Sequence, residues 1–507
     1  MKVKKGITIS IALGLSILSY FLIPGGDFPQ APYVGAMVVL MAVLWITEVI
    51  PIPVTSLFPL FLLPILGVLP VKEVSVFYGK PIIFLFLGGF LLAIALQKSG
   101  LHKRIALKIL AFIGDKPAGI VLGFFLAGSL LSMWISNTAS VMVMLPVGLS
   151  ILNQLKSKDV PPAVLAKIGL GIMLAMAYGA DIGGMATPVG TPPNLVFQEM
   201  YKDMFPLAPE ISFVDWMMIG LPISILFIIS GWLLLTKVLL RLPKASLLGG
   251  RNIIRQQLKE LGKLKGDEKI AGFIFALTAL LWMSGSDLRM GEWGIIHGWR
   301  SQLGLAGLSD AGVAILMASI LFVIPSKERK EEPLLVWADA SQIPWGILLL
   351  FGGGFAIAGG FTKSGLSDII GQGFAQIEVS SPIFVVAFIN TLLTFLTEIT
   401  SNTAMTNLVL PILGEASVVM HIDPRLIMIP ATLSASCAFM MPIASPTQAI
   451  VFASGHVPIR EMMRIGIWFN VLGVILVTLV FILIGQFVLG IDVQEFPDWA
   501  MKVGELK

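Results

Sequence analysis

The feature that most constrains the fold is a duplication within the chain. The segment FLGGFLLAIALQKSGL, from Phe86 to Leu101, returns as FGGGFAIAGGFTKSGL, from Phe351 to Leu366. The tetrapeptide Ser-Asn-Thr-Ala at 136–139 returns at 401–404, and both pairs are separated by 265 residues. One shared separation predicts two homologous halves. Each half carries a polar tetrapeptide between apolar segments, which is typical of transporters whose site lies between their repeats.

Composition places this duplication in a membrane. Of the 507 residues, 56% are hydrophobic and 13% are charged, and the mean hydropathy is +0.91. About a quarter of the residues of soluble globular proteins are charged, so the sequence predicts an all-α polytopic membrane protein in contact with lipid. The net charge of +4 belongs to the loops and indicates no nucleic-acid partner.

Apolar runs of about 17 to 25 residues, each able to cross roughly 30 Å of hydrocarbon, predict eleven transmembrane helices. They begin near Gly6, Tyr33, Val54, Pro81, Val164, Val214, Ile270, Ala311, Pro344, Leu426 and Ile465. Two further pairs of apolar segments, 118–135 with 139–155 and 383–399 with 404–420, are interrupted by the tetrapeptides. We expect these pairs to form two re-entrant hairpins.

The distribution of basic residues predicts the orientation. With a cytoplasmic amino terminus, eleven crossings place the basic 241–269 linker and the basic helix after the first KSGL inside, and the acidic carboxyl-terminal tail outside. The second KSGL precedes Asp368 and Glu378, which the same rule places outside. We therefore expect the two copies to cross the membrane in opposite directions, as inverted repeats.

The two tetrapeptides combine groups that suit an anion and a cation. Ser, Asn and Thr are common helix N-caps, so capping alone explains one isolated triplet. Two hairpin tips inserted from opposite sides would bring two helix amino termini, with their partial positive charge and free N–H groups, to one place. Oxygen atoms are the ligands of hard cations, and Ser132 and Thr397 add a hydroxyl one turn before each triplet.

A second pair of interruptions lies at matching places in the two halves. GGMATPVGTPPN at 183–194 breaks the fifth crossing, and MPIASPTQ at 441–448 breaks the tenth. Aligning Pro188 with Pro442 places Thr191 opposite Ser445. Proline and glycine at membrane depth unwind a helix and free its carbonyl groups, so we expect these breaks to line the site beside the tips.

Charged residues are scarce around these motifs. They contain no Arg, Lys or His, so a bound anion would depend on amides, hydroxyls, helix dipoles and bound cations, which favours cation-coupled uptake. Intramembrane acids are functional candidates: Glu48, Asp181, which would tune cation affinity or couple protons, and Glu398, which would equally pair with hairpin N–H groups. A hydrolase using Ser136 or Ser401 needs a base that the neighbouring sequence lacks, so no enzyme is predicted.

The motifs together resemble the divalent anion/sodium symporter family, which includes bacterial dicarboxylate and citrate carriers; they are the two SNT triplets, TPVGTPPN, WITEVIPIPVTSLFPLFLLPILGVLP and SASCAFMMPIASP. The resemblance implies a homodimer in the bacterial inner membrane, with a transport domain that moves as an elevator against a scaffold. On that plan the scaffold is 1–116 and 270–381, the transport domain is 117–240 and 382–507, and 241–269 is a cytoplasmic linker.

The resemblance also implies a site. Substrate carboxylates would meet Asn137, Thr138, Asn402, Thr403, Ser445 and Pro446. One sodium ion would bind Ser132, Ser136, Asn137 and a carbonyl near Gly184, and a second Thr397, Ser401, Asn402 and a carbonyl near Ala444. The family frequently has Thr at position 445 and Pro-Pro-Asn at 446–448, and its pattern does not include an acid at 181.

The sequence therefore predicts sodium-coupled uptake of C4-dicarboxylates such as succinate, malate or fumarate. A sodium-independent dicarboxylate exchanger and a carrier of citrate or sulfate are alternatives on the same scaffold. An ion channel would use the same oxygen-lined tips, but two opposed hairpins that block the path favour alternating access.

Overall fold

The computed structural model describes residues 2–112, 116–157, 160–244, 250–289, 295–305, 307–329, 331–374, 381–493 and 495–501. Within these ranges the chain is predominantly helical. The first half, with the linker, contains α1 (Lys2–Leu22), α2 (Ala31–Thr47), α3 (Ile52–Thr55), α4 (Pro59–Ile65), α5 (Val71–Phe77), α6 (Pro81–Ser99), α7 (Leu101–Phe112), α8 (Pro117–Ser132), α9 (Asn137–Lys156), α10 (Pro162–Gly184), α11 (Pro192–Met204), α12 (Phe213–Leu233) and α13 (Gly250–Glu260). Residues 245–249 of the predicted linker, and Glu378, lie outside the described ranges.

The second half contains a similar succession. It comprises α14 (Gly266–Met283), α15 (Trp299–Gln302), α16 (Asp310–Leu321), α17 (Trp345–Ser364), α18 (Leu366–Phe374), α19 (Pro382–Leu396), α20 (Asn402–Val419), α21 (Pro424–Ala435), α22 (Pro446–Ala453), α23 (Ile459–Val480) and α24 (Gln486–Leu489). Short 3-10 segments occur at Trp337–Gln342, Thr397–Ile399 and Asp498–Ala500, and π-helical segments at Leu234–Leu239 and Phe481–Gly485.

The described ranges agree with the expected all-α class, and one short β-hairpin is added to the helices. After α14, β1 (Leu288–Arg289) pairs antiparallel with β2 (Ile295–Ile296), the one sheet in the described ranges. The β-branched pair Ile295-Ile296 favours an extended conformation, and the apolar run that forms α14 has already ended.

The helix boundaries repeat at the separation seen in the sequence. α7 and α18 begin 265 residues apart, as do α8 and α19, and α9 and α20. α6 and α17 both end at a glycine with a left-handed backbone, Gly100 at φ 84° and Gly365 at φ 75°. Such a backbone strongly favours glycine, which explains why both copies of KSGL carry one.

Eight helices in the described ranges are long and apolar enough to span a membrane. They include α9 and α19, which are arms of the predicted hairpins. The predicted run lengths are wrong at the third and eighth crossings: the third is divided into α3 and α4, and α16 has only 12 residues, or about 18 Å. Proline explains the division, since Pro59 begins α4 and Pro64 lies inside it. The count of eleven crossings stays a prediction.

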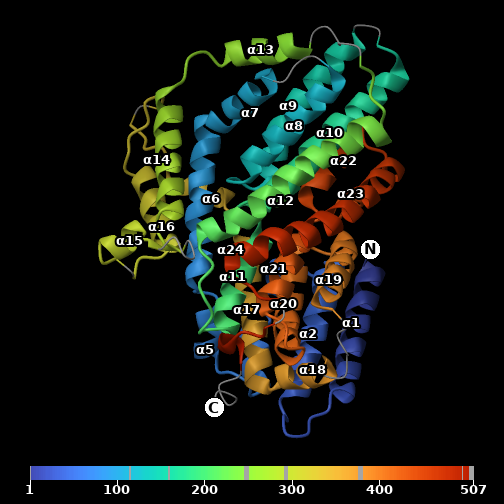
Figure 1. The fold of residues 1–507 in the computed structure, drawn as a ribbon, viewed down its shortest axis with the longest axis vertical. Helices are drawn as coiled ribbons and strands as arrows, with labels where there is room; N and C mark the ends of the chain where they lie inside the picture. The colour runs from blue at the N-terminus through green and yellow to red at the C-terminus, as the bar shows by residue number, and fades with distance from the viewer. Residues whose placement is uncertain are drawn as a thin grey trace.

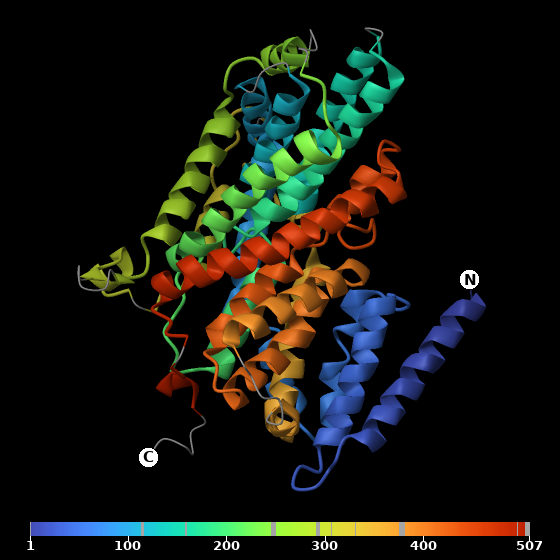
Figure 2. The same ribbon diagram turned by 45° about the vertical axis from the view of Figure 1, so that its right-hand side comes forward.

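The two predicted hairpins lie on opposite sides of a central layer. Figure 1 shows α8 and α9 in its upper part and α19 and α20 in its lower part. α12 and α23 run side by side between them in both views (Figures 1 and 2), and Phe227 of α12 stacks on Phe469 of α23. This arrangement directs the connection inside each hairpin toward the middle of the molecule.

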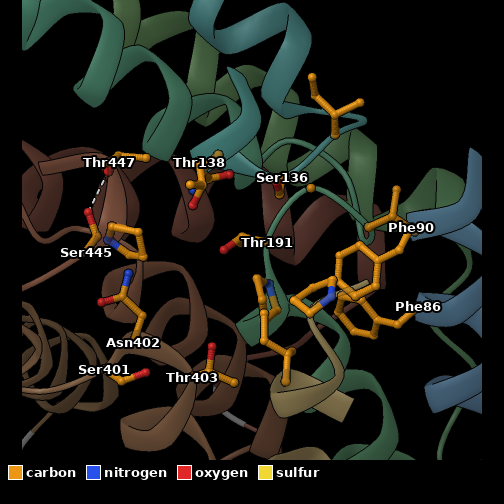
Figure 3. Close-up of a pocket in the computed structure, with 18 of the residues that line it drawn as sticks. Phe86, Phe90, Ser136, Thr138, Thr191, Ser401, Asn402, Thr403, Ser445 and Thr447 are labelled. Atoms are coloured by element: carbon orange, nitrogen blue, oxygen red, sulfur yellow. Dashed lines mark hydrogen bonds between the residues drawn. The ribbon is translucent and has the colours of Figure 1, made fainter. Parts of the chain in front are cut away.

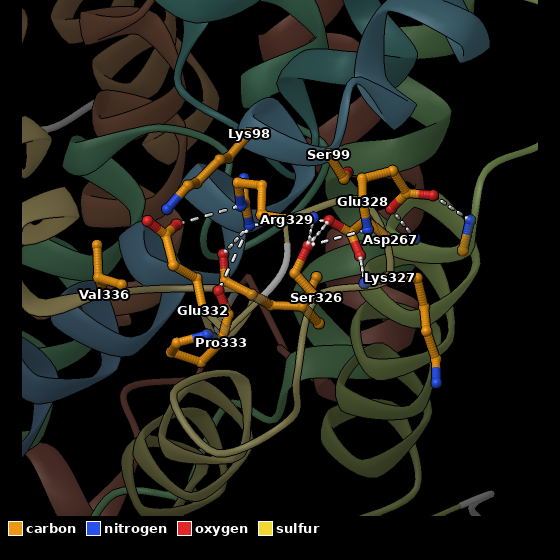
Figure 4. A network of polar contacts seen from close by, with 12 residues as sticks. Lys98, Ser99, Asp267, Ser326, Lys327, Glu328, Arg329, Glu332, Pro333 and Val336 are labelled. Carbon is orange, nitrogen blue, oxygen red and sulfur yellow. Dashed lines mark hydrogen bonds and ion pairs between the residues drawn. The ribbon is translucent and has the colours of Figure 1, made fainter.

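A polar network holds the end of α6 to the segments around α14 and α16 (Figure 4). Lys98 pairs with Asp339 at 2.5 Å, and Asp267 accepts hydrogen bonds from the Ser326 hydroxyl at 2.6 Å and the Lys327 N–H at 2.7 Å. Arg104 of α7 pairs with Glu268 at 2.9 Å. These contacts join elements on both sides of the linker, all of which belong to the predicted scaffold or the linker itself.

Candidate functional site

The first hairpin turns at residues 133–136, between α8 and α9. Ser136 is the N-cap of α9, and its hydroxyl oxygen accepts the Ala139 N–H at 3.3 Å. Ser132 donates to the Asn137 side-chain oxygen at 2.5 Å. Capping and site formation are therefore compatible at this tip, since the cap fixes the helix start while the Ser132 hydroxyl orients the Asn137 amide.

The second hairpin repeats this geometry with different partners. Thr397 donates to the Asn402 side-chain oxygen at 2.7 Å, and its hydroxyl also lies 3.0 Å from the Ala435 carbonyl oxygen. Ser401 is the N-cap of α20 but makes no side-chain cap hydrogen bond. Unlike the Ser136 hydroxyl, the Ser401 hydroxyl is therefore not used to cap its helix.

Both tips and both helix breaks line one cavity of about 600 Å³. All six predicted substrate residues lie in its wall, namely Asn137, Thr138, Asn402, Thr403, Ser445 and Pro446. Figure 3 shows the second tip, Ser401 to Thr403, on one side of the space and Phe86 and Phe90 on the other. Glu48, which ends α2 with a left-handed backbone at φ 48°, also lines the cavity.

The predicted cation ligands divide between the cavity wall and a layer behind it. Ser136, Asn137, Ser401, Asn402 and Ala444 line the cavity. Ser132 and Thr397 are fully buried and reach it through their bonds to Asn137 and Asn402. Gly184 is also buried, and a side chain there would meet the Asn137 amide oxygen. Each half thus gathers neutral oxygen atoms of the kind that bind a hard cation.

Thr187 and Asn194, in the first break, make structural hydrogen bonds that the sequence analysis did not predict. Asn194 donates to the carbonyl oxygens of Gly184 at 3.1 Å and Thr187 at 2.8 Å, and Thr187 donates to the Met133 carbonyl oxygen at 2.5 Å. These bonds satisfy carbonyl groups that unwinding frees and tie the break to the first tip. The polar residues of TPVGTPPN were the signal for this role.

Asp181 lies where the two halves meet. Its carboxylate accepts hydrogen bonds from Asn137 at 3.1 Å, Thr447 at 2.9 Å and Gln448 at 3.0 Å, and a longer one from Ser445 at 3.4 Å. Positions 181, 445, 447 and 448, at which the chain departs from the family pattern, are thus in contact with one another. The prediction that Asp181 is close to the first oxygen cluster agrees with its bond to Asn137.

Glu398 has a different set of partners from the one predicted. Its carboxylate accepts the backbone N–H groups of Phe439, Met440 and Met441 at 2.7 to 2.9 Å, and the Asn470 amide at 2.7 Å. These N–H groups belong to the break between α21 and α22, not to the hairpin, so the expected partner was wrong. The break is also longer than predicted, because α21 ends at Ala435.

Comparison with known proteins identifies the family. Residues 5–491 match the model of the sodium:sulfate symporter transmembrane region. The chain belongs to this family. The match covers nearly the whole chain and confirms the resemblance to divalent anion/sodium symporters, and with the apolar helices it makes the protein an integral membrane protein.

Relatives within the family support this assignment. The sodium-dependent dicarboxylate transporters SdcS of Staphylococcus saprophyticus and Staphylococcus aureus are each 40% identical over 497 residues, which is 97% of this chain and 93% of theirs. Among solved structures, MtrF of Neisseria gonorrhoeae has a TM-score of 0.56 at 16% identity, covering 81% of this chain and 82% of its own. YdaH of Alcanivorax borkumensis, a transporter, has a TM-score of 0.50 at 17% identity, covering 82% and 87%. These two likenesses concern the fold.

Proposed function

We propose that this symporter-family member is a secondary active transporter that couples sodium entry to the uptake of C4-dicarboxylates such as succinate, malate or fumarate. The observation that carries the proposal is the single cavity lined by both hairpin tips. The cargo and the coupling ion are taken from the names of the staphylococcal relatives.

A dianion in this cavity would be held by helix amino termini, not by basic side chains. α9, α11, α20 and α22 begin at Asn137, Pro192, Asn402 and Pro446, and all four residues line it. Each terminus carries a partial positive charge. Donor N–H groups come mainly from α9 and α20, because Pro192, Pro193 and Pro446 have none. The lining of the cavity, among the described residues, contains no Lys, Arg or His. Two Asn-Thr pairs, one from each half, match the two carboxylates of the proposed substrate.

Sodium supplies the missing positive charge and the driving force. The first ion would bind among Ser132, Ser136, Asn137 and the Gly184 carbonyl, and the second among Thr397, Ser401, Asn402 and a carbonyl near Ala444. Transporting more cation charge than anion charge gains about 2.3 kcal/mol for each net charge moved across 100 mV. Accumulation against a gradient follows from that gain.

The proposed movement is an elevator. Residues 117–240 and 382–507 would carry the site across the bilayer against a scaffold of 1–116 and 270–381, with 241–269 as the cytoplasmic linker. We further propose a homodimer of inverted repeats in a bacterial inner membrane, with the amino terminus in the cytoplasm and the carboxyl terminus outside. The two oppositely placed hairpins support alternating access rather than an open channel.

The decisive experiment is uptake of labelled succinate into proteoliposomes after an inward sodium jump. Asn137→Ala and Asn402→Ala should each reduce uptake at least about tenfold, because each removes a hydrogen-bonding group at a charged ligand. Asn153→Ala, at an exposed position on α9, should retain wild-type uptake. Uptake that needs internal dicarboxylate and ignores the sodium gradient would instead identify an exchanger. Excess unlabelled citrate, sulfate, malate and fumarate define the cargo.

A further inference from the structure

Asp181 has a buried carboxyl group that pairs with no basic side chain in the described ranges. It is 2% exposed, and its hydrogen-bond donors are the neutral side chains of Asn137, Ser445, Thr447 and Gln448. No ion pair in the described ranges includes it. Burying a carboxylate without a counter-charge is costly, so this arrangement favours a cation nearby.

The carboxylate lies beside the first set of proposed sodium ligands. Asn137 joins them: its amide nitrogen donates to Asp181, and its amide oxygen accepts from Ser132. Gly184 is three residues further along the same helix and lies against that oxygen. A cation bound to the oxygen atoms of Ser132, Asn137 and Gly184 would therefore be separated from the Asp181 carboxylate by the Asn137 side chain alone.

An unpaired acceptor adjoins the same carboxylate. Gln448 is fully buried, and its amide nitrogen must face Asp181 because only that end of the amide can donate to a carboxylate. Its amide oxygen has no hydrogen-bond donor in the described chain. A buried oxygen without a donor is costly, and a cation ligand is one way to satisfy it.

The second half has no equivalent charge. The alignment of Pro188 with Pro442 places Ala435 opposite Asp181, and the Ala435 carbonyl oxygen lies next to Thr397. Glu398 follows Thr397, but its carboxylate is engaged by three N–H groups and Asn470. The two proposed cation sites are therefore electrostatically unequal.

From this geometry we infer that Asp181 is the anionic member of the first sodium site and makes dianion binding conditional on that ion. The inference rests on the proposed function for the identity of the ion and the cargo. With sodium bound, the Asp181–sodium pair is neutral, and Glu48 is the one other acid in the described cavity lining. Without sodium, the bare carboxylate repels the dianion across the cavity, so sodium binds before the substrate.

Binding measurements on the purified full-length protein test this inference without transport. Sodium is titrated at constant ionic strength with choline as the replacement, and binding is followed by tryptophan fluorescence, since Trp134 and Trp282 line the cavity. Asp181→Asn should weaken sodium binding at least about tenfold, the direction and scale expected for removing an adjacent opposite charge. The same variant should bind succinate without sodium, whereas the wild type should not. Glu73→Gln, an exposed acid on α5, is the control and should behave as wild type.

Failure of this inference and failure of the proposed function give different results. Unchanged sodium affinity in Asp181→Asn, with succinate binding still dependent on sodium, overturns the inference even if the wild type transports succinate. A wild type that takes up no succinate overturns the proposed function, whatever the sodium titration gives. If Asp181→Asn does not yield folded protein, Asp181→Ser removes the same charge with a smaller side chain and is read in the same way.

Discussion

The two buried acids Asp181 and Glu398 have different kinds of hydrogen-bond donors around them. Asp181 is held by side-chain donors from both halves, and Glu398 by three consecutive backbone N–H groups and Asn470. Backbone N–H groups freed by a helix break need an acceptor wherever water is excluded. We therefore expect Glu398 to stabilise the second break, and we propose that Asp181 acts toward a ligand.

This contrast predicts the effect of Glu398→Gln. The amide keeps the shape but has one acceptor oxygen in place of two, so at least one buried N–H group loses its partner at a cost of about 1–3 kcal/mol. We expect a clearly lower melting temperature in detergent, measured by the loss of monodisperse protein on heating. Sodium affinity of the first site should not change. A melting temperature equal to that of the wild type would show that Glu398 does not stabilise the break.

The sequence predicted which residues line the candidate site better than it predicted their hydrogen-bond partners. The duplicated triplets led to Asn137, Thr138, Asn402 and Thr403, which line one cavity in the structure. The contacts of Asp181 with Thr447 and Gln448 span more than half of the chain. Such pairs depend on how separate helices pack, and neither periodicity nor motif spacing in one sequence contains that information.

At the scale of helices, the first hairpin is held against α10 by glycine. A side chain at Gly179 or Gly183 would overlap the backbone of Phe125 or Ser129 on α8. Small residues at such positions allow helices to approach closely in membranes. The close approach places Asp181, between these glycines on α10, beside the first tip.

Gly183→Ala should therefore displace α8 and disturb the first tip. The added methyl group meets backbone atoms, which cannot move aside as a flexible side chain does. We expect succinate uptake to fall at least about tenfold, in line with the cost of overpacking a tight contact. Gly14→Ala on α1, where nothing lies within 4 Å of the added carbon, controls for the substitution itself. Equal uptake by both variants would show that this close approach is not required.

Element boundaries followed the sequence closely where proline or a cap marks them. α8, α19, α10 and α22 each have proline at the start, and the two tips precede α9 and α20 as expected. The third and eighth crossings were less predictable. Hydropathy reports how apolar a run is but not whether its prolines and neighbours let it continue as one helix.

At the scale of the whole molecule, one ion-pair cluster joins the two proposed domains. Lys80, in the segment assigned to the scaffold, contacts Glu199 at 3.5 Å and pairs with Asp203, both on α11 of the proposed transport domain. By contrast, Lys98 and Asp339 pair within the proposed scaffold. If the domains slide past each other, the first cluster must separate during transport and the second must not.

Paired cysteine substitutions distinguish these two cases. Cys437 is the only native cysteine and is fully buried, so reagents should react mainly at introduced positions. Bridging Lys80→Cys to Asp203→Cys with a short bifunctional thiol reagent should stop succinate uptake, and a reductant should restore it. Bridging Lys98→Cys to Asp339→Cys should leave uptake intact, since both positions would move together. Full uptake by the completely bridged Lys80→Cys, Asp203→Cys variant would contradict a sliding movement at this boundary, because a tether of that length cannot follow an element displaced by a helical turn or more.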